Sequence, residues 1–232
     1  MSSQQILEEG INLYKQQDYT EALAFFLSLP ADSGADPVDI AYYLGLCYSK
    51  LQRYDDAMLY LEQVITAAGE EESLATNERV LQCRYLLAVI YCLSGRRQLA
   101  NFELENLLNT GYKTSSVYAS FAYISWQQGD IEACLSYYEK SLKEDENNPT
   151  ALNGMGYVLA EDGRDLAKAL TLCKKALELA PESAACLDSM GWVYYKMGLF
   201  SQSRKYLEQA YQKDSKSEII RQHLHQAEMV DK

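Results

Sequence analysis

Apolar and small residues recur along this chain in paired helical stripes, and the pairs return about every 34 residues. Near the C-terminus, Leu187, Met190 and Tyr194 follow the i, i+3, i+7 spacing of one helical face. A second stripe with the same periodicity contains Leu207. Gly198 stands between the two stripes and can adopt the positive φ that ends a helix. The pattern therefore predicts a helix, a tight turn and a second helix.

The preceding segment contains nearly the same pattern. Met155-Gly156 recurs as Met190-Gly191, and Gly163 recurs as Gly198. A small residue in the first stripe lets two antiparallel helices approach closely, and the large residues around it fill the remaining space. Because one such hairpin cannot bury both of its faces, the sequence predicts a stack of hairpins.

These residues resemble the tetratricopeptide repeat, whose signature places a large residue, Leu-Gly, Tyr, Ala, a large residue, Ala and Pro within about 34 positions. The resemblance covers nearly the whole chain. It implies an all-α fold, a right-handed superhelical solenoid of about six helix hairpins with a C-terminal capping helix. The expected repeats of this single domain (residues 1–232) are 3–36, 38–71, 81–114, 115–148, 149–183 and 184–217, and the cap helix is 218–230.

The third repeat is irregular, because residues 72–80 are extra to its pattern. We interpret Ser73 to Ser94 as one overlong first helix. Two explanations stay open: a simple variation in length, or a protruding contact surface that uses Leu74 and Val80.

The expected cap helix carries Ile219, Ile220, Leu224 and Ala227 on one face and polar residues elsewhere. The two histidines of the chain, His223 and His225, also lie on it. Residues two apart on a helix do not share a face, so they form a poor metal-binding pair.

Composition narrows the choice of partners. The net charge is −12 and no cluster of Lys and Arg is present, so we expect neither nucleic acid nor an anionic membrane as a partner. No apolar run approaches the length of a membrane span, and the first residues lack the features of a secretory signal. We therefore expect a cytoplasmic protein, unless a leader sequence has been removed.

Residues for catalysis are missing from the pattern. No histidine outside 223 and 225 is available for a nucleophilic dyad, and no phosphate-binding glycine motif occurs. We predict that the chain is not an enzyme and needs no cofactor or metal. None of the six cysteines forms a CxxC pair, so buried free thiols are favoured over a disulfide framework or a metal site. They are Cys47, Cys83, Cys92, Cys134, Cys173 and Cys186.

In tetratricopeptide solenoids the first helix of each hairpin lines a concave groove, and the resemblance implies that repeat positions 5, 9 and 12 face it. In this sequence those positions are largely aromatic and apolar. The candidate peptide-binding residues are Tyr42, Tyr85, Tyr123, Trp126, Asn153, Tyr157, Asp188, Trp192 and Tyr195. Tyr42, Tyr85 and Tyr195 are also explained by packing within the stack, so both interpretations stay open for them.

Family members that bind an acidic chaperone tail carry Lys at position 5 and Asn at position 9, and no repeat here has them. An extended or helical segment with apolar side chains fits better, with Asn153 and Asp188 available to its backbone. We therefore predict a scaffold or adaptor that binds a segment of another protein. The alternatives are a structural or assembly subunit that contacts neighbours in a larger complex through its convex face, and a cytoplasmic sensor of a peptide or metabolite.

Overall fold

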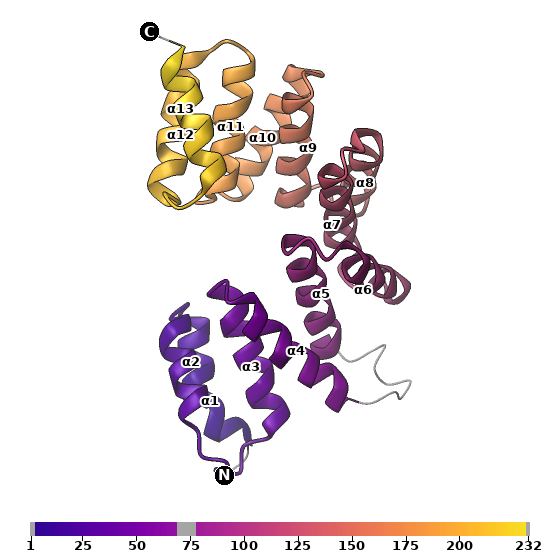
Figure 1. The fold of residues 1–232 in the computed structure, drawn as a ribbon, viewed down its shortest axis with the longest axis vertical. Helices are drawn as coiled ribbons and strands as arrows, with labels where there is room; N and C mark the ends of the chain where they lie inside the picture. The colour runs from indigo at the N-terminus through magenta and orange to yellow at the C-terminus, as the bar shows by residue number, and fades with distance from the viewer. Residues whose placement is uncertain (1–2, 69–77, 231–232) are drawn as a thin grey trace. The chain divides into compact units, whose positions relative to one another are not determined.

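The computed structural model describes residues 3–68 and 78–230, and within these ranges the chain forms thirteen helices and no strand (Figure 1). The chain divides into two compact units, Met1–Tyr112 and Lys113–Lys232. The predicted all-helical repeat fold is confirmed. That residues 1–232 form one continuous solenoid stays a prediction.

Unit 1 (Met1–Tyr112) contains three helix hairpins, in which consecutive helices pack against each other. Its helices are α1 (Ser3–Lys15), α2 (Tyr19–Ser28), α3 (Pro37–Lys50), α4 (Tyr54–Ala67), α5 (Glu78–Leu93) and α6 (Arg97–Thr110). The turn of the third hairpin uses Gly95 at φ 71°, whereas the first two use Gln17 and Gln52 at positive φ. A left-handed residue thus closes each of these hairpins, and it need not be glycine.

Unit 2 (Lys113–Lys232) contains three further hairpins and a final helix. Its helices are α7 (Thr114–Gln127), α8 (Ile131–Glu144), α9 (Pro149–Glu161), α10 (Leu166–Leu179), α11 (Ala184–Lys196), α12 (Phe200–Lys213) and α13 (Glu218–Met229). Helices α9 and α11 begin where short polar side chains accept a backbone N–H, Asn148 from Ala151 and Ser183 from Cys186. These two caps fix where α9 and α11 start, and therefore which of their side chains line the inner face.

Small residues allow the two helices of a hairpin to touch. A Cβ placed on Gly191 of α11 would lie 2.6 Å from Leu207 Cγ in α12, and one on Gly156 of α9 would lie 2.5 Å from Cys173 Sγ in α10. Such distances are far below van der Waals contact, so only glycine fits there. The predicted close approach of paired helices is therefore present in the structure.

The expectations for Val80 and for the buried face of α13 need correction, whereas the predicted start of the third-repeat helix stays a prediction. The overlong third-repeat helix was predicted from Ser73, which lies with Leu74 outside the described residues, and α5 is described from Glu78 onward. Val80 is 1% exposed, so it is not part of a protruding surface. On α13 the buried side chains are Ile220, His223 and Ala227, whereas Ile219 is exposed. The apolar face predicted for this helix is thus rotated, and His223 lies on the buried side.

All six cysteines are buried and free. Burial raises the pKa of the Cys47 and Cys92 thiols to about 11, and that of Cys83, Cys134 and Cys173 to about 12. The thiols therefore stay protonated at pH 8 in the folded state. Above the ordinary thiol pKa the unfolded chain loses these protons more readily than the folded one, so the free energy of unfolding falls until the pH passes the raised pKa values.

We expect DTNB to modify none of the six thiols at pH 8 within minutes, and all six once the chain is unfolded in guanidinium chloride. Absorbance at the reagent's product band counts the modified thiols. Rapid modification of the folded chain would contradict the buried packing of these side chains.

Candidate functional site

The first helices of the last two hairpins place chemically matched residues at the same positions. Asn153 and Tyr157 of α9 correspond to Asp188 and Trp192 of α11. In each helix the polar residue and the ring are four positions apart, so they share one face. Each helix thus presents a hydrogen-bond acceptor beside an aromatic ring.

The Trp192 ring is enclosed by its neighbours. It stacks on His223 of α13 with ring centroids 4.0 Å apart, and on Tyr195 at 4.9 Å. Its indole Nε1–H donates to Glu161 Oε2 at 2.6 Å, and Lys196 Nζ lies 4.8 Å from the ring centroid. Only 4% of Trp192 is exposed, so it packs inside the protein rather than on an open surface.

The second contact of His223 is with Asp188. His223 Nδ1–H donates to the Asp188 carboxylate, with distances of 2.9 and 3.0 Å to its two oxygens. A carboxylate can only accept, so the proton is on the nitrogen. Both side chains are buried, and this pairing offsets the cost of removing Asp188 from water.

Tyr157 continues the row of rings towards α7. Its ring centroid lies 6.1 Å from that of His223 and 6.1 Å from that of Trp126, within the range of aromatic pairing. Burial, with smaller contributions from the Glu161 and Asp188 carboxylates, raises the pKa of Tyr157 to about 12. We call Trp126, Tyr157, His223, Trp192 and Tyr195 the aromatic wall.

Beside the aromatic wall, two predicted residues are partly exposed. Tyr123 of α7 accepts a hydrogen bond from Gln127 Nε2 at 2.9 Å. Asn153 is half-buried, and its side-chain Oδ1 is buried without a hydrogen-bond partner. A polar atom left in this way costs free energy, so Asn153 is a poor choice for stability alone.

The remaining predicted residues, Tyr42 of α3 and Tyr85 of α5, belong to unit 1 and are half-buried. Tyr42 Oη–H donates to Gln82 Oε1 at 2.8 Å, and the Arg79 guanidinium lies 4.9 Å from its ring centroid. Both partners are on α5, so these contacts tie two first helices of unit 1 together. This favours the packing interpretation for Tyr42.

Sequence reasoning missed His223, which the structure places between Tyr157 and Trp192. Its signal was present: His223 lies three residues after Ile220 and four before Ala227, on the stripe that is buried. The contact also changes the prediction for Asp188, because the carboxylate offered to a ligand backbone is already engaged by His223. Tyr123, Trp126, Asn153 and Tyr157 are only partly buried, and their contact with a partner stays a prediction.

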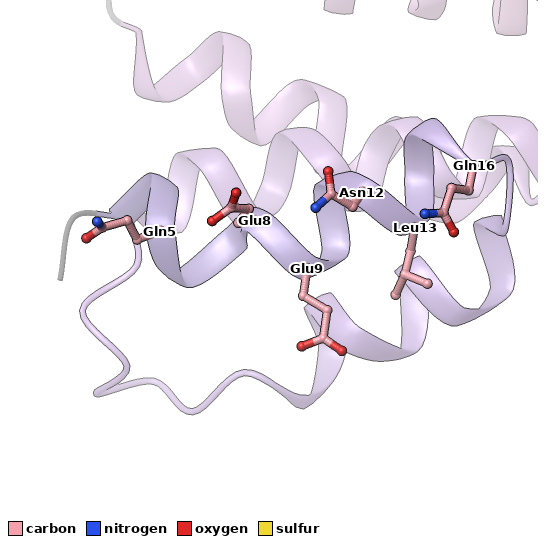
Figure 2. Close-up of a pocket in the computed structure, with 6 residues that line it drawn as sticks. All are labelled: Gln5, Glu8, Glu9, Asn12, Leu13 and Gln16. Carbon is pink, nitrogen blue, oxygen red and sulfur yellow. The ribbon is translucent and has the colours of Figure 1, made fainter.

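Two surface depressions are found in unit 1. One, of about 450 Å³, is lined by side chains of α1 and by Gln16, which follows it, and most of these side chains are polar (Figure 2). The other, of about 370 Å³, lies where Gly95 to Leu99 lead into α6. Neither contains a predicted site residue. Among the described residues, no group of three or more His, Cys, Asp or Glu side chains is arranged to hold a metal ion.

Three sequence models, each described as "Tetratricopeptide repeat", match residues 7–72, 115–148 and 147–216. The chain belongs to the tetratricopeptide repeat family. Members of this family generally mediate protein–protein interactions and the assembly of complexes. No helix among the described residues is both long enough and apolar enough to cross a bilayer.

Curated relatives match part of the chain. A tetratricopeptide repeat-containing protein of Pseudomonas aeruginosa is 37% identical over 89 residues, which is 37% of this chain and 15% of that protein. The photosystem I assembly protein Ycf3 of Prochlorococcus marinus is 35% identical over 89 residues, 37% of this chain and 51% of Ycf3. The chain therefore spans about half the length of Ycf3 and well under half of the Pseudomonas protein.

Solved structures match the fold over nearly the whole chain. A tetratricopeptide repeat protein from Parabacteroides merdae has a TM-score of 0.74 at 15% identity, covering 96% of this chain and 82% of that one. A chain of the APC/C hetero-tetramer Cut9–Hcn1 matches with a TM-score of 0.73 at 14% identity. The match covers 97% of this chain and 42% of that chain. At these identities the likeness concerns the fold.

Proposed function

We propose that this protein is a non-enzymatic adaptor that binds a segment of a partner protein on the face of unit 2 formed by α7 and α9, beside the aromatic wall. The observation that supports it most is the row of rings from Trp126 through Tyr157 to His223. Tyr and Trp are the side chains that most often anchor protein interfaces.

The charge distribution of the same helices supports an apolar segment as the ligand. The sequence of α7 contains no Asp, Glu, Lys or Arg, and the only charged residue of α9 is Glu161 at its end. The whole chain has a net charge of −12, yet these two adjacent first helices together contain one charged residue. Depletion of charge at the centre of a surface is a feature of protein interfaces.

Site-specific photo-crosslinking in the native organism tests the proposal. A photoreactive phenylalanine analogue replaces Tyr123 on the inner helix α7 or, as the matched control, exposed Thr171 on the outer helix α10. We expect a discrete crosslinked partner from position 123 and none from position 171. Mass spectrometry of the product identifies the partner segment.

A second candidate function is that of an assembly subunit which contacts its neighbours through the outer helices of unit 1. Leu59 of α4 is 63% exposed and Phe102 of α6 is 59% exposed, which is high for large apolar side chains. Placing the photoreactive analogue at position 102 distinguishes the adaptor from the assembly subunit. A partner crosslinked from 102 and not from 123 would contradict the proposal and support this alternative.

A further inference from the structure

His223 shows how unit 2 recognises a side chain. The planar ring of His223 lies against Trp192 at 4.0 Å while its N–H is held by Asp188. The pair that holds His223 therefore consists of an acceptor, Asp188, and an aromatic ring four residues later, Trp192. Such a pair suits a flat side chain that carries an N–H donor at its edge.

The same pair exists in α9 as Asn153 and Tyr157, and no residue in the part of the chain that the structure describes donates to Asn153 Oδ1 while stacking on Tyr157. The place that His223 takes on α13 corresponds to Ser189 on α11, which offers neither a ring nor a planar N–H group. Asn153 Oδ1 is left without a hydrogen-bond partner. The torsion that orients a carboxamide is soft, so a ligand can turn this oxygen towards itself.

Charges around Tyr157 select among planar N–H donors. The Glu161 and Asp188 carboxylates are close enough to raise the pKa of Tyr157. Lys196 pairs with Glu161 at 3.3 Å and His223 pairs with Asp188 at 2.9 Å, but the chain as a whole carries a net charge of −12, which attracts cations. A cation is thus favoured beside Tyr157. Among cationic side chains, guanidinium is planar, stacks on aromatic rings and carries N–H donors at its edge.

We propose that the partner segment, whose binding to this face is the proposed function on which this inference rests, inserts an arginine that stacks on Tyr157 and donates to Asn153. The arginine reproduces from outside the chain what His223 does for Trp192 and Asp188. The rest of the segment is apolar, since α7 is uncharged.

The test uses blocked pentapeptides, acetyl-Gly-Leu-Xaa-Leu-Gly-amide, in which Xaa is arginine, lysine or norleucine. They are titrated into the isotope-labelled full chain, and NMR follows the Asn153 side-chain amide and the Trp126 indole N–H. We expect the arginine peptide to bind about tenfold more tightly than the norleucine peptide and about fivefold more tightly than the lysine peptide. Both signals should shift in a saturable way.

Variants assign this preference to Asn153. Asn153→Leu should remove the advantage of arginine over norleucine without lowering Tm, because the deleted oxygen has no partner to lose. Asn153→Asp should instead increase the affinity for the arginine peptide several-fold. Asn101→Leu, which removes a comparable partnerless Oδ1 in unit 1, is the matched control and should leave the preference intact.

Equal binding of the three peptides, with shifts at Trp126, would overturn the inference and leave the binding face itself supported. An unchanged arginine preference in Asn153→Leu would also overturn it. If no peptide shifts these signals, arginine recognition at Asn153 is wrong, and the crosslinking from position 123 decides the proposed function by itself.

Discussion

Gly191→Leu lowers the free energy of unfolding of unit 2 by about 3 kcal/mol, because it forces side-chain atoms between α11 and α12. A Cβ at this position would already lie 2.6 Å from Leu207 Cγ and 3.1 Å from the Leu207 backbone nitrogen. The backbone contact means that a change of rotamer cannot relieve the overlap. Guanidinium denaturation followed by tryptophan fluorescence measures the effect, since Trp126 and Trp192 both lie in unit 2.

Ala185→Leu is the matched control, because it adds the larger side chain to an exposed position of the same helix. We expect it to change stability by less than about 0.5 kcal/mol. Similar denaturation curves for Gly191→Leu and the wild type would contradict the close contact of the paired helices, on which every hairpin of the fold depends.

Trp192→Ala should cost unit 2 about 3–4 kcal/mol, which is typical for a buried aromatic side chain in a core. The substitution removes the stacks on His223 and Tyr195 and leaves Glu161 Oε2 without its indole donor. It also opens the contact that holds α13 on α11, so His223 and Asp188 lose their cover. Fluorescence of the remaining Trp126 reports the unfolding midpoint.

Tyr211→Ala provides the comparison, since this aromatic residue of α12 is 38% exposed. Its expected cost is about 1 kcal/mol or less. If Trp192→Ala is no more destabilising than Tyr211→Ala, then Trp192 is not an internal packing residue, and its interpretation as an open ligand anchor regains support.

The fold could be predicted from the sequence because it depends on local spacing. Gly191 and Leu207 belong to neighbouring helices of one hairpin, so the repeat pattern alone brings them together. Ser141 stands where the repeat pattern has Ala, and its buried hydroxyl donates to the Ser115 backbone oxygen at 2.7 Å. The spacing of apolar residues could not predict which polar group the Ser141 hydroxyl would contact.

The site was harder to predict because it combines residues from helices that are distant in the sequence. The repeat spacing placed Asp188 and Trp192 on the inner face of α11, yet it could not show that His223 of α13 contacts both of them. His223 is 35 residues from Asp188, and the orientation of α13 decides the contact. A cap helix has no following repeat to define its buried face, so only the apolar residues of α13 indicate which face is buried. Ile219 is apolar but exposed, and it therefore gave the wrong face.

The most direct test measures the affinity of the partner segment identified by crosslinking for the wild-type chain and for Tyr157→Ala. Isothermal titration calorimetry with the purified segment gives both values, and circular dichroism checks that the variant is folded. Because a true aromatic anchor contributes about 2 kcal/mol or more, Tyr157→Ala should weaken binding by about 30-fold. Unchanged affinity in the folded variant would contradict a binding face centred on the aromatic wall.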